Sequence, residues 1–304
     1  MAGVLLAVLL LCPHPRALAQ AITAYAVIDS PSGKVLLTKN ANKRLAIGSL
    51  TNIATAMVVL DWLDVRKRDV NETVTIPTET AGFPTNPIGF QPGDQATIRD
   101  LLYAALMQSD DIAAYALAMH VGHDLPTSIS NETPVQAFIA QMNALARRLQ
   151  MRNTIFVDPT GMEMDAHRLP YSTALDLAQL ARYAMNRSQF RFYVSQKARE
   201  ITVDHEGLAP SSYELQNTNQ LLGVDSVDGL KTSTTRRTGP CVIISAARPP
   251  ASMQVGETYY ITSRRLVVVV LGSEDRFGAA QELLLTGWQA YDQWVAAGRP
   301  IRGG

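Results

Sequence analysis

The chain has 304 residues, of which 47% are hydrophobic and 18% are charged, and its 27 basic and 27 acidic side chains give a formal net charge of zero. This composition is typical of a folded protein with a sizeable core and argues against extensive disorder. A balanced charge gives no sign of a polyanionic partner, so we expect no nucleic-acid binding and no general attraction to anionic membranes.

The first residues predict an export signal. Val4–Leu11 form an apolar run that is too short to span a bilayer. Ala17-Leu18-Ala19 follow as an A-x-A cleavage site. We therefore expect residues 1–19 to be a cleaved signal peptide, and the mature protein to begin at Gln20 in the periplasm or otherwise outside the cytoplasm. The start Met1-Ala2-Gly3 carries no positive charge, which departs from the usual pattern of such signals.

Cys241 would be the one cysteine left after this cleavage, and it stands next to the apolar run Val242-Ile243-Ile244. A lone cysteine forms no intramolecular disulfide, so the core is expected to supply the stability. No apolar stretch after residue 20 is long enough to span a membrane, and the sequence therefore predicts a mature protein that is soluble and has no transmembrane span.

The N-terminal third is predicted to hold a hairpin and a helix. The mainly apolar segments Tyr25–Asp29 and Val35–Leu37 flank the turn Ser30–Gly33, which is the pattern of a β-hairpin. A helix is expected from Ser49 or Leu50 to about Asp64, because the apolar residues within it recur at helical spacing, at Ile53, Met57, Leu60 and Leu63.

The middle third is predicted to be helical. Thr97 is a candidate N-cap for a helix that runs through Gln108, with Asp100 in the capping-box position. Further helices are expected over residues 112–121, 134–150 and 172–186.

The last third changes to strands, which are predicted at residues 201–203, 241–246 and 266–271 before a closing helix at 282–294. The run Leu266–Leu271 is apolar at every position, so both of its faces should be buried. This order predicts one α+β domain over residues 20–295, in which a sheet joins the two ends of the chain around an inserted helical lobe, and a short tail at 296–304.

Three short segments are candidates for chemistry: Ser49-Leu50-Thr51-Asn52, Ser109-Asp110-Asp111 and Lys231-Thr232-Ser233. Each is a weak signal alone. Together they have the order and spacing of S-x-x-K, S-x-N and K-T-G, the active-site set of penicillin-binding proteins and serine β-lactamases.

The flanking segments make the resemblance more specific. They read IDSPSGKV at 28–35, LMQSDDIA at 106–113, NTIFVDPTGM at 153–162, YSTALDLA at 171–178 and VDGLKT at 227–232, with NTN at 217–219 followed by Leu221 and Leu222. Over roughly residues 22–292 the chain resembles the penicillin-binding D-alanyl-D-alanine carboxypeptidases. The resemblance implies the β-lactamase/transpeptidase-like fold, with an antiparallel sheet flanked by helices, and no cofactor or metal.

The resemblance also implies roles for the motif residues. Ser49 would be the nucleophile, and position 52 would hold the lysine that takes its proton. Ser109 would relay protons, while position 111 would hold an amide that binds the peptide of the substrate. The implied substrate is a peptidoglycan stem peptide ending in D-Ala-D-Ala, and penicillins would mimic it and acylate Ser49.

The third motif is implied to lie on a strand edge. There Lys231 and Thr232 would bind the terminal carboxylate of the substrate, beside position 233. The backbone N–H groups of Ser49 and Thr234 would form the oxyanion hole.

All three motifs depart from the family pattern. Asn52 replaces the lysine, and a neutral amide is no general base near pH 7; such a base contributes about 10²–10⁴-fold to a rate. Asp111 replaces an asparagine and puts an acid near an anionic substrate, unless the carboxyl is protonated. Ser233 replaces a glycine and adds a side chain at a close approach, which is the mildest change.

Two classes of function follow from these changes. The chain is either a serine D,D-carboxypeptidase of low activity, with Lys231 partly replacing the missing base, or a non-catalytic relative that binds peptidoglycan or a partner in wall synthesis. A β-lactamase is a weaker alternative, because the flanks are those of carboxypeptidases and no glutamate can be assigned as the deacylating base.

Other signals carry less weight. His120 and His123 lie three residues apart, but the sequence offers no third metal ligand, so a surface or capping role is favoured. A Ser-His-Asp hydrolase would need His167 or His205 beside Ser49, and the Gly-x-Ser-x-Gly motif is absent.

Overall fold

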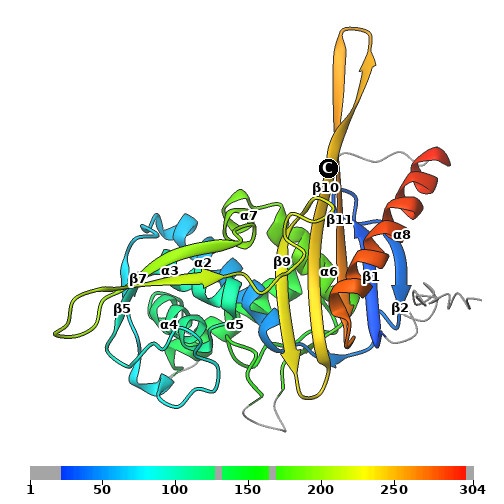
Figure 1. Cartoon of the computed structure of the whole chain (residues 1–304). Coiled ribbons are helices and arrows are strands. Elements are labelled where there is room, and N and C mark those ends of the chain that lie inside the picture. The colour runs from blue at the N-terminus through cyan, green and yellow to red at the C-terminus, as the bar shows by residue number, and fades with distance from the viewer. Residues whose placement is uncertain (1–21, 127–131, 164–168, 299–304) are drawn as a thin grey trace, which may run out of the picture.

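The structure is a computed structural model that describes residues 22–126, 132–163 and 169–298. The expected signal peptide at 1–19 and residues 299–304 of the expected tail lie outside the described residues. Figure 1 shows a sheet with helices on either face, beside a lobe made mainly of helices.

The sheet has five antiparallel strands in the order β2-β1-β11-β10-β9. Their bounds are Ala24–Asp29 for β1, Val35–Lys39 for β2, Val227–Thr235 for β9, Gly239–Val255 for β10 and Thr258–Leu271 for β11. The pairing of β1 with β11 sets Ala24 opposite Leu271, so the first and last strands of the chain are neighbours. This confirms the expected sheet that joins the two ends.

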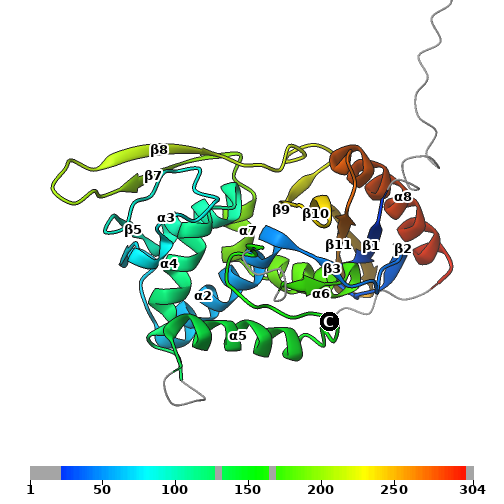
Figure 2. The same cartoon turned by 90° about the horizontal axis from the view of Figure 1, so that it is seen from below.

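Helices cover both faces of this sheet (Figure 2). One face packs against α8 (Arg276–Ala296), and the other faces α6 (Ala174–Met185). Side chains of β11 alternate between the two cores: Leu266, Val268 and Val270 lie in the cluster that contains α8, and Val267, Val269 and Leu271 lie in the cluster shared with the helical lobe. The expected burial of this run on both faces is therefore confirmed.

The helical lobe is inserted between β2 and β9. Its helices are α2 (Asn52–Arg66), α3 (Ile98–Tyr103), α4 (Asp111–Gly122), α5 (Pro134–Arg148) and α7 (Ser188–Val194), with short turns η1 (Gly48–Thr51), η2 (Thr78–Thr80) and η3 (Ala104–Gln108). Three small two-stranded sheets complete it: β3 (Leu45–Ala46) with β6 (Tyr171–Ser172), β4 (Thr73–Thr75) with β5 (Gln95–Thr97), and β7 (Ala198–Val203) with β8 (Ser211–Gln216). Within the described ranges, no helix has the length and hydropathy of a membrane span.

The main elements lie near their predicted positions, but α7, β8 and the start of α8 at Arg276 were not predicted, and two further differences have a structural reason. The helix capped by Thr97, whose side chain accepts from the N–H of Asp100, changes to a π-helix at Ala104–Gln108. Strands β10 and β11 extend well beyond the predicted segments, as a ribbon that leaves the sheet in Figure 1. Hydrophobic patterns detect buried strand segments, and most of the added residues between 249 and 262 are exposed.

Candidate active site

The three motifs meet in a cleft of about 240 Å³ between the helical lobe and the edge strand β9. Ser49 lies on η1 just before α2, Asp111 begins α4, and Thr234 lies on β9; all three line the cleft. Residues separated by about 60 and 120 positions in the sequence are thus brought together by packing η1 against β9 and α2 against α4.

Ser49 is half-buried and lines the cleft from the 3₁₀ turn that leads into α2. A helix start directs free backbone N–H groups outward, which suits an oxyanion. Among the residues that the structure describes, no side chain forms a hydrogen bond with the Ser49 hydroxyl. The nucleophile that the sequence predicts is accessible, but no base contacts it.

Asn52 is fully buried, and its side chain serves the core. Its Nδ2 donates to the carbonyl oxygen of Ala105 in η3 at 3.0 Å, whereas its Oδ1 has no hydrogen-bond partner among the described residues. Leaving a buried oxygen without a hydrogen-bond partner is costly. The amide binds α2 to η3 and offers Ser49 no basic nitrogen.

Lys231 and Ser109 form the second part of the site. Lys231 is buried on β9, and its Nζ donates to Ser109 Oγ and, at 3.3 Å, to the carbonyl oxygen of Thr232. Ser109 has a left-handed backbone (φ 59°), an uncommon conformation outside glycine that here ends η3. Burial lowers the pKa of Lys231 to about 7, although Asp111 opposes this. Part of this amine is therefore neutral near pH 7.

Asp111 is almost fully buried at the start of α4. Burial raises the pKa of its carboxyl to about 7, with Asp110 and Asp158 acting in the same direction and a hydrogen bond from Thr85 opposing them. Below pH 7 this carboxyl is mainly protonated and offers a donor, as an amide would. The electrostatic penalty that the sequence predicts is thus reduced at neutral and acidic pH.

The substitution Asp111→Asn is expected to remove a pH-dependent loss of stability. Below about pH 4 the carboxyl is protonated in both states; between pH 4 and 7 the unfolded state ionises while the folded state stays protonated, so the free energy of unfolding falls as pH rises. Three pH units at about 1.4 kcal/mol each set an upper limit of roughly 4 kcal/mol on this loss of stability. At pH 8 the free energy of unfolding of Asp111→Asn should therefore be about 2 kcal/mol higher than that of the native protein. Urea unfolding of both proteins at pH 4 and pH 8 measures these free energies. A difference between the two proteins that is the same at both pH values would contradict the prediction.

The edge of β9 presents backbone groups to the cleft. The carbonyl oxygen of Pro240 accepts from the N–H of Ser273 on the β11 side, so the Thr234–Pro240 pair is not hydrogen-bonded and the N–H of Thr234 points to the open edge. This is the orientation that an oxyanion-hole donor needs. On the inner side, Arg276 donates to the Ser233 carbonyl oxygen at 2.9 Å and to Thr234 Oγ1 at 3.1 Å. Arg276 is absent from the motifs, and sequence reasoning missed it.

Ser233 occupies space that Gly48 leaves open. A Cβ at Gly48 would lie 2.5 Å from Ser233 Oγ and 2.6 Å from a methyl group of Thr235, which no real Cβ tolerates. Ser233 Oγ is buried without a hydrogen-bond partner among the described residues, so the hydroxyl fills volume and no polar role is evident. The serine in the third motif and the glycine before the nucleophile are therefore sterically coupled.

A double-mutant cycle tests this coupling. Gly48→Ala is expected to lower the free energy of unfolding by about 2 kcal/mol, because of the clash and of the positive φ at Gly48 (49°). Ser233→Gly in the same chain should recover about 1 kcal/mol of that loss, because it removes the clash with Ser233 Oγ while the clash with Thr235 and the positive φ remain. Urea unfolding measures all four proteins, and additive effects would show that the two side chains do not meet.

The other sequence candidates lie elsewhere. His205 Nδ1 is 2.8 Å from Asp94 Oδ1, and its Nε2 is 3.3 Å from the hydroxyl of Tyr213, with no contact to Ser49. His167 lies outside the described residues. His120 faces Glu72 at 3.8 Å, and over the described part of the chain no group of three metal-binding side chains occurs.

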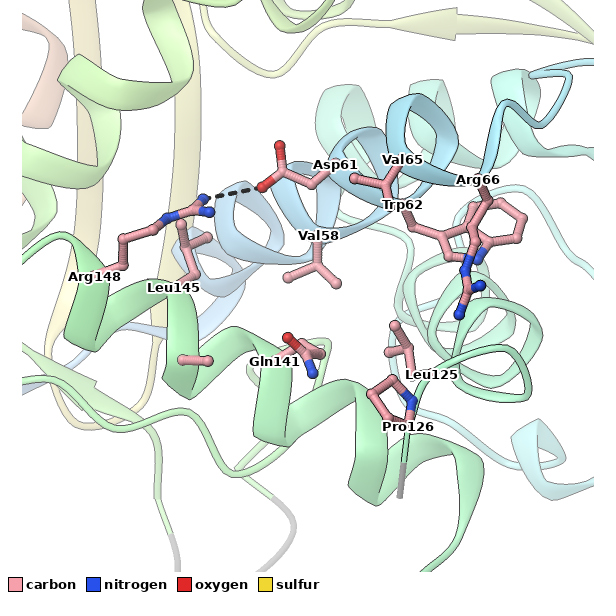
Figure 3. A pocket seen from close by; sticks show the side chains of 11 residues that line it. Val58, Asp61, Trp62, Val65, Arg66, Leu125, Pro126, Gln141, Leu145 and Arg148 are labelled. Atoms are coloured by element: carbon pink, nitrogen blue, oxygen red, sulfur yellow. Dashed lines mark hydrogen bonds and ion pairs between the residues drawn. The ribbon is translucent and has the colours of Figure 1, made fainter. Parts of the chain in front are cut away.

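A second cavity, of about 400 Å³, lies between α2 and α5 (Figure 3). Val58, Trp62 and Leu145 contribute its apolar lining, and Arg148 donates to Asp61 at 3.0 Å beside it. None of the motif residues lines this cavity. The motif residues Ser49, Asp111 and Thr234 line the cleft at Ser49 instead.

Comparison with known proteins identifies the family. Residues 14–255 match the family described as D-alanyl-D-alanine carboxypeptidase. The chain belongs to this family, whose members act in cell-wall metabolism. The family that the motifs and their flanks predict is confirmed.

Three relatives illustrate how far the similarity extends. The chain is 30% identical over 226 residues to the D-alanyl-D-alanine carboxypeptidase DacF of Bacillus subtilis, covering 73% of this chain and 53% of DacF. It is 29% identical over 280 residues to DacC of Escherichia coli, covering 88% of this chain and 62% of DacC. It is 33% identical over 234 residues to the carboxypeptidase of Streptomyces sp. strain K15, covering 75% and 77%. The chain thus spans 53% of the length of DacF and 62% of that of DacC.

Solved structures confirm the predicted fold. The Streptomyces K15 DD-transpeptidase aligns with a TM-score of 0.73 and 26% identity, covering 88% of this chain and 97% of that one. Penicillin-binding protein D2 of Listeria monocytogenes, in its ampicillin-bound form, aligns with a TM-score of 0.69 and 26% identity, covering 88% and 98%.

Proposed function

We propose that the mature chain is an exported cell-wall protein that binds the D-Ala-D-Ala end of peptidoglycan stem peptides at Ser49 and has lost most of the carboxypeptidase reaction. Penicillins would enter the same cleft. Family membership supports the substrate class, and the ampicillin-bound state of the Listeria protein supports the binding of β-lactams. No cofactor takes part in this proposal.

Several groups in the cleft support substrate binding. The open edge of β9 offers the N–H of Thr234, and Lys231 places a partly charged amine beside Ser109. Asp111, protonated below pH 7, supplies a donor where the family has an amide. These groups would hold the carboxylate and the peptide bond of a stem peptide by charge-assisted and backbone hydrogen bonds.

One observation carries the proposed loss of activity: the side chain at position 52 is a neutral amide committed to the carbonyl oxygen of Ala105. Ser49 then has no adjacent group to take its proton in acylation, and a serine hydroxyl is a weak nucleophile without one. Lys231 reaches Ser109 instead, so any residual reaction would transfer the Ser49 proton through Ser109 to Lys231.

Intact-mass measurement after incubation with benzylpenicillin tests this proposal. The native protein should keep its unmodified mass over hours, while the triple variant Asn52→Lys/Asp111→Asn/Ser233→Gly should gain one penicilloyl group at Ser49. A synthetic peptide ending in D-Ala-D-Ala should bind the native protein in calorimetry without release of D-alanine. Rapid acylation or D-alanine release by the native protein would refute the loss of activity, and failure to bind the peptide would refute the substrate.

Export is tested separately. Expression with the full leader should give a mature protein whose N-terminal sequence begins at Gln20 and which fractionates outside the cytoplasm, because Ala17-Leu18-Ala19 is the cleavage site we propose. A cytoplasmic protein that retains Met1 would contradict this.

A further inference from the structure

Strand β11 continues past the end of β1 and leaves one of its edges open. The last backbone bond between the two strands runs from the N–H of Ser30 to the carbonyl oxygen of Arg265, at 2.8 Å. From there to Thr258, β11 pairs only with β10 among the described residues. The N–H and C=O groups of successive residues in a strand point to alternate sides. Those of Ser263 and Ile261 therefore point to the same side as those of Arg265, where no described strand pairs with them.

A cleft of about 600 Å³ lies against this edge, where the β1–β2 turn, α6 and α7 meet. Three arginines and no acidic residue line it: Arg182, Arg191 and Arg265. Arg265 pairs with Asp228 at 2.7 Å, but neither Arg182 nor Arg191 forms an ion pair in the described part of the chain. The cleft therefore carries positive charge that the fold does not neutralise.

The two unneutralised arginines are held in place by carbonyl oxygens. Arg182 donates to the carbonyl oxygens of Ser30 and Pro31 at 2.6 and 2.9 Å, and Arg191 donates to that of Met185 at 2.5 Å. Carbonyl groups orient a guanidinium but leave its charge and its remaining N–H donors available. Such pre-positioned donors suit a carboxylate.

Two buried side chains, Ser30 and Asp29, lie beside these arginines. Ser30, which lines the cleft, is fully buried, and its hydroxyl has no hydrogen-bond partner among the described residues. A buried hydroxyl in this state favours a ligand that supplies a partner. The carboxyl of Asp29 is buried and accepts hydrogen bonds from Ser32; burial raises its pKa, and it attracts Arg182 electrostatically without forming an ion pair.

We propose that the open edge of β11 binds an extended, acidic peptide segment of a partner protein, which adds a strand in line with β1. The backbone of the peptide would pair with Ser263 and Ile261, and its acidic side chains would reach Arg182 and Arg191. Ile261 is 74% exposed and would contact an apolar side chain of the peptide. A second copy of this chain fits poorly, because residues 249–262 of its own ribbon contain one acidic residue, Glu257.

Charge is tested with a fluorescein-labelled octapeptide of alternating Glu and Val, and a matched peptide of alternating Gln and Val, in anisotropy titrations at low salt. The glutamate peptide should bind at least about tenfold more tightly, and Arg191→Gln should remove most of that advantage. Arg148→Gln is the matched control, because Arg148 pairs with Asp61 and does not line the cleft, and this variant should bind as the native protein does. Equal affinity for both peptides would overturn the proposal, as would inorganic phosphate binding without peptide binding.

Strand addition is tested by comparing Ile261→Pro with Ile261→Ala. Both remove the apolar side chain, but only proline removes the outward N–H, and β10 does not use this N–H, so both variants should fold. Proline should weaken peptide binding about tenfold relative to alanine; equal binding would overturn strand addition. Excess unlabelled D-Ala-D-Ala peptide should not compete, so the outcome is independent of the function proposed for Ser49. Competition, or concentration-dependent dimers paired through this edge, would overturn the assignment.

Discussion

Asn52→Lys is expected to raise the rate at which benzylpenicillin acylates Ser49 by about 10²–10⁴-fold, the usual contribution of a positioned general base. Residues three apart on a helix share a face, and position 52 begins α2 just after the turn that holds Ser49. The introduced amine would take the place of an amide whose oxygen is unsatisfied, and the Ala105 carbonyl oxygen would remain as its acceptor. Burial at position 52 would favour its neutral, basic form.

Intact-mass kinetics at pH 7.5 measures this gain. Asn52→Met is the matched control, because it is about as long as lysine but has no basic nitrogen, and it should stay as slow as the native protein. The gain should be nearer its lower limit while Asp111 and Ser233 remain, and it should increase in the triple variant. If the folded triple variant also failed to acylate, the loss of reaction would not lie in the motif residues.

Lys231→Met is expected to stabilise the protein while removing its residual reaction. With a folded pKa of about 7 against 10.5 in the unfolded chain, Lys231 is charged in both states below pH 7, where the folded state bears the full cost of burying the charge. Between pH 7 and 10.5 only the unfolded state stays protonated, so stability rises with pH; above 10.5 the amine is neutral in both. The full difference is about 5 kcal/mol at about 1.4 kcal/mol per pH unit.

The variant should therefore be about 2–4 kcal/mol more stable at pH 6, after the lost hydrogen bonds to Ser109 and Thr232 are taken into account, and this advantage should shrink towards pH 10. Urea unfolding across this range measures it, and Lys43→Met, at an exposed lysine, should change stability by less than about 0.5 kcal/mol. Residual acylation should fall at least tenfold. A destabilised Lys231→Met protein at pH 6 would show that the buried amine contributes net stability.

Local patterns in the sequence predicted the fold class and the order of the main elements. The helical spacing of Ile53, Met57, Leu60 and Leu63 predicted α2, and the unbroken apolar run at 266–271 predicted the buried core of β11. Burial of one helix face leaves an apolar period in the sequence, and burial of both strand faces leaves an unbroken apolar run. The ribbon at 249–262 was not predicted, because strands that are exposed on both faces show neither pattern.

By itself, the sequence determined which groups are present at the motif positions, and hence that no base stands three residues after Ser49. Only the tertiary structure decided how those groups behave. Packing of β9 against η1 buries Lys231 and brings its Nζ to Ser109, and burial of Asp111 keeps its carboxyl protonated up to about pH 7. The role of Arg276 and the contact between Gly48 and Ser233 were likewise beyond prediction, since each joins segments that are distant in the sequence. The protonation of Lys231 and Asp111 depends on their burial, and the fit of Ser233 against Gly48 depends on a long-range contact. Local sequence patterns predict neither burial at a single site nor contacts between distant segments.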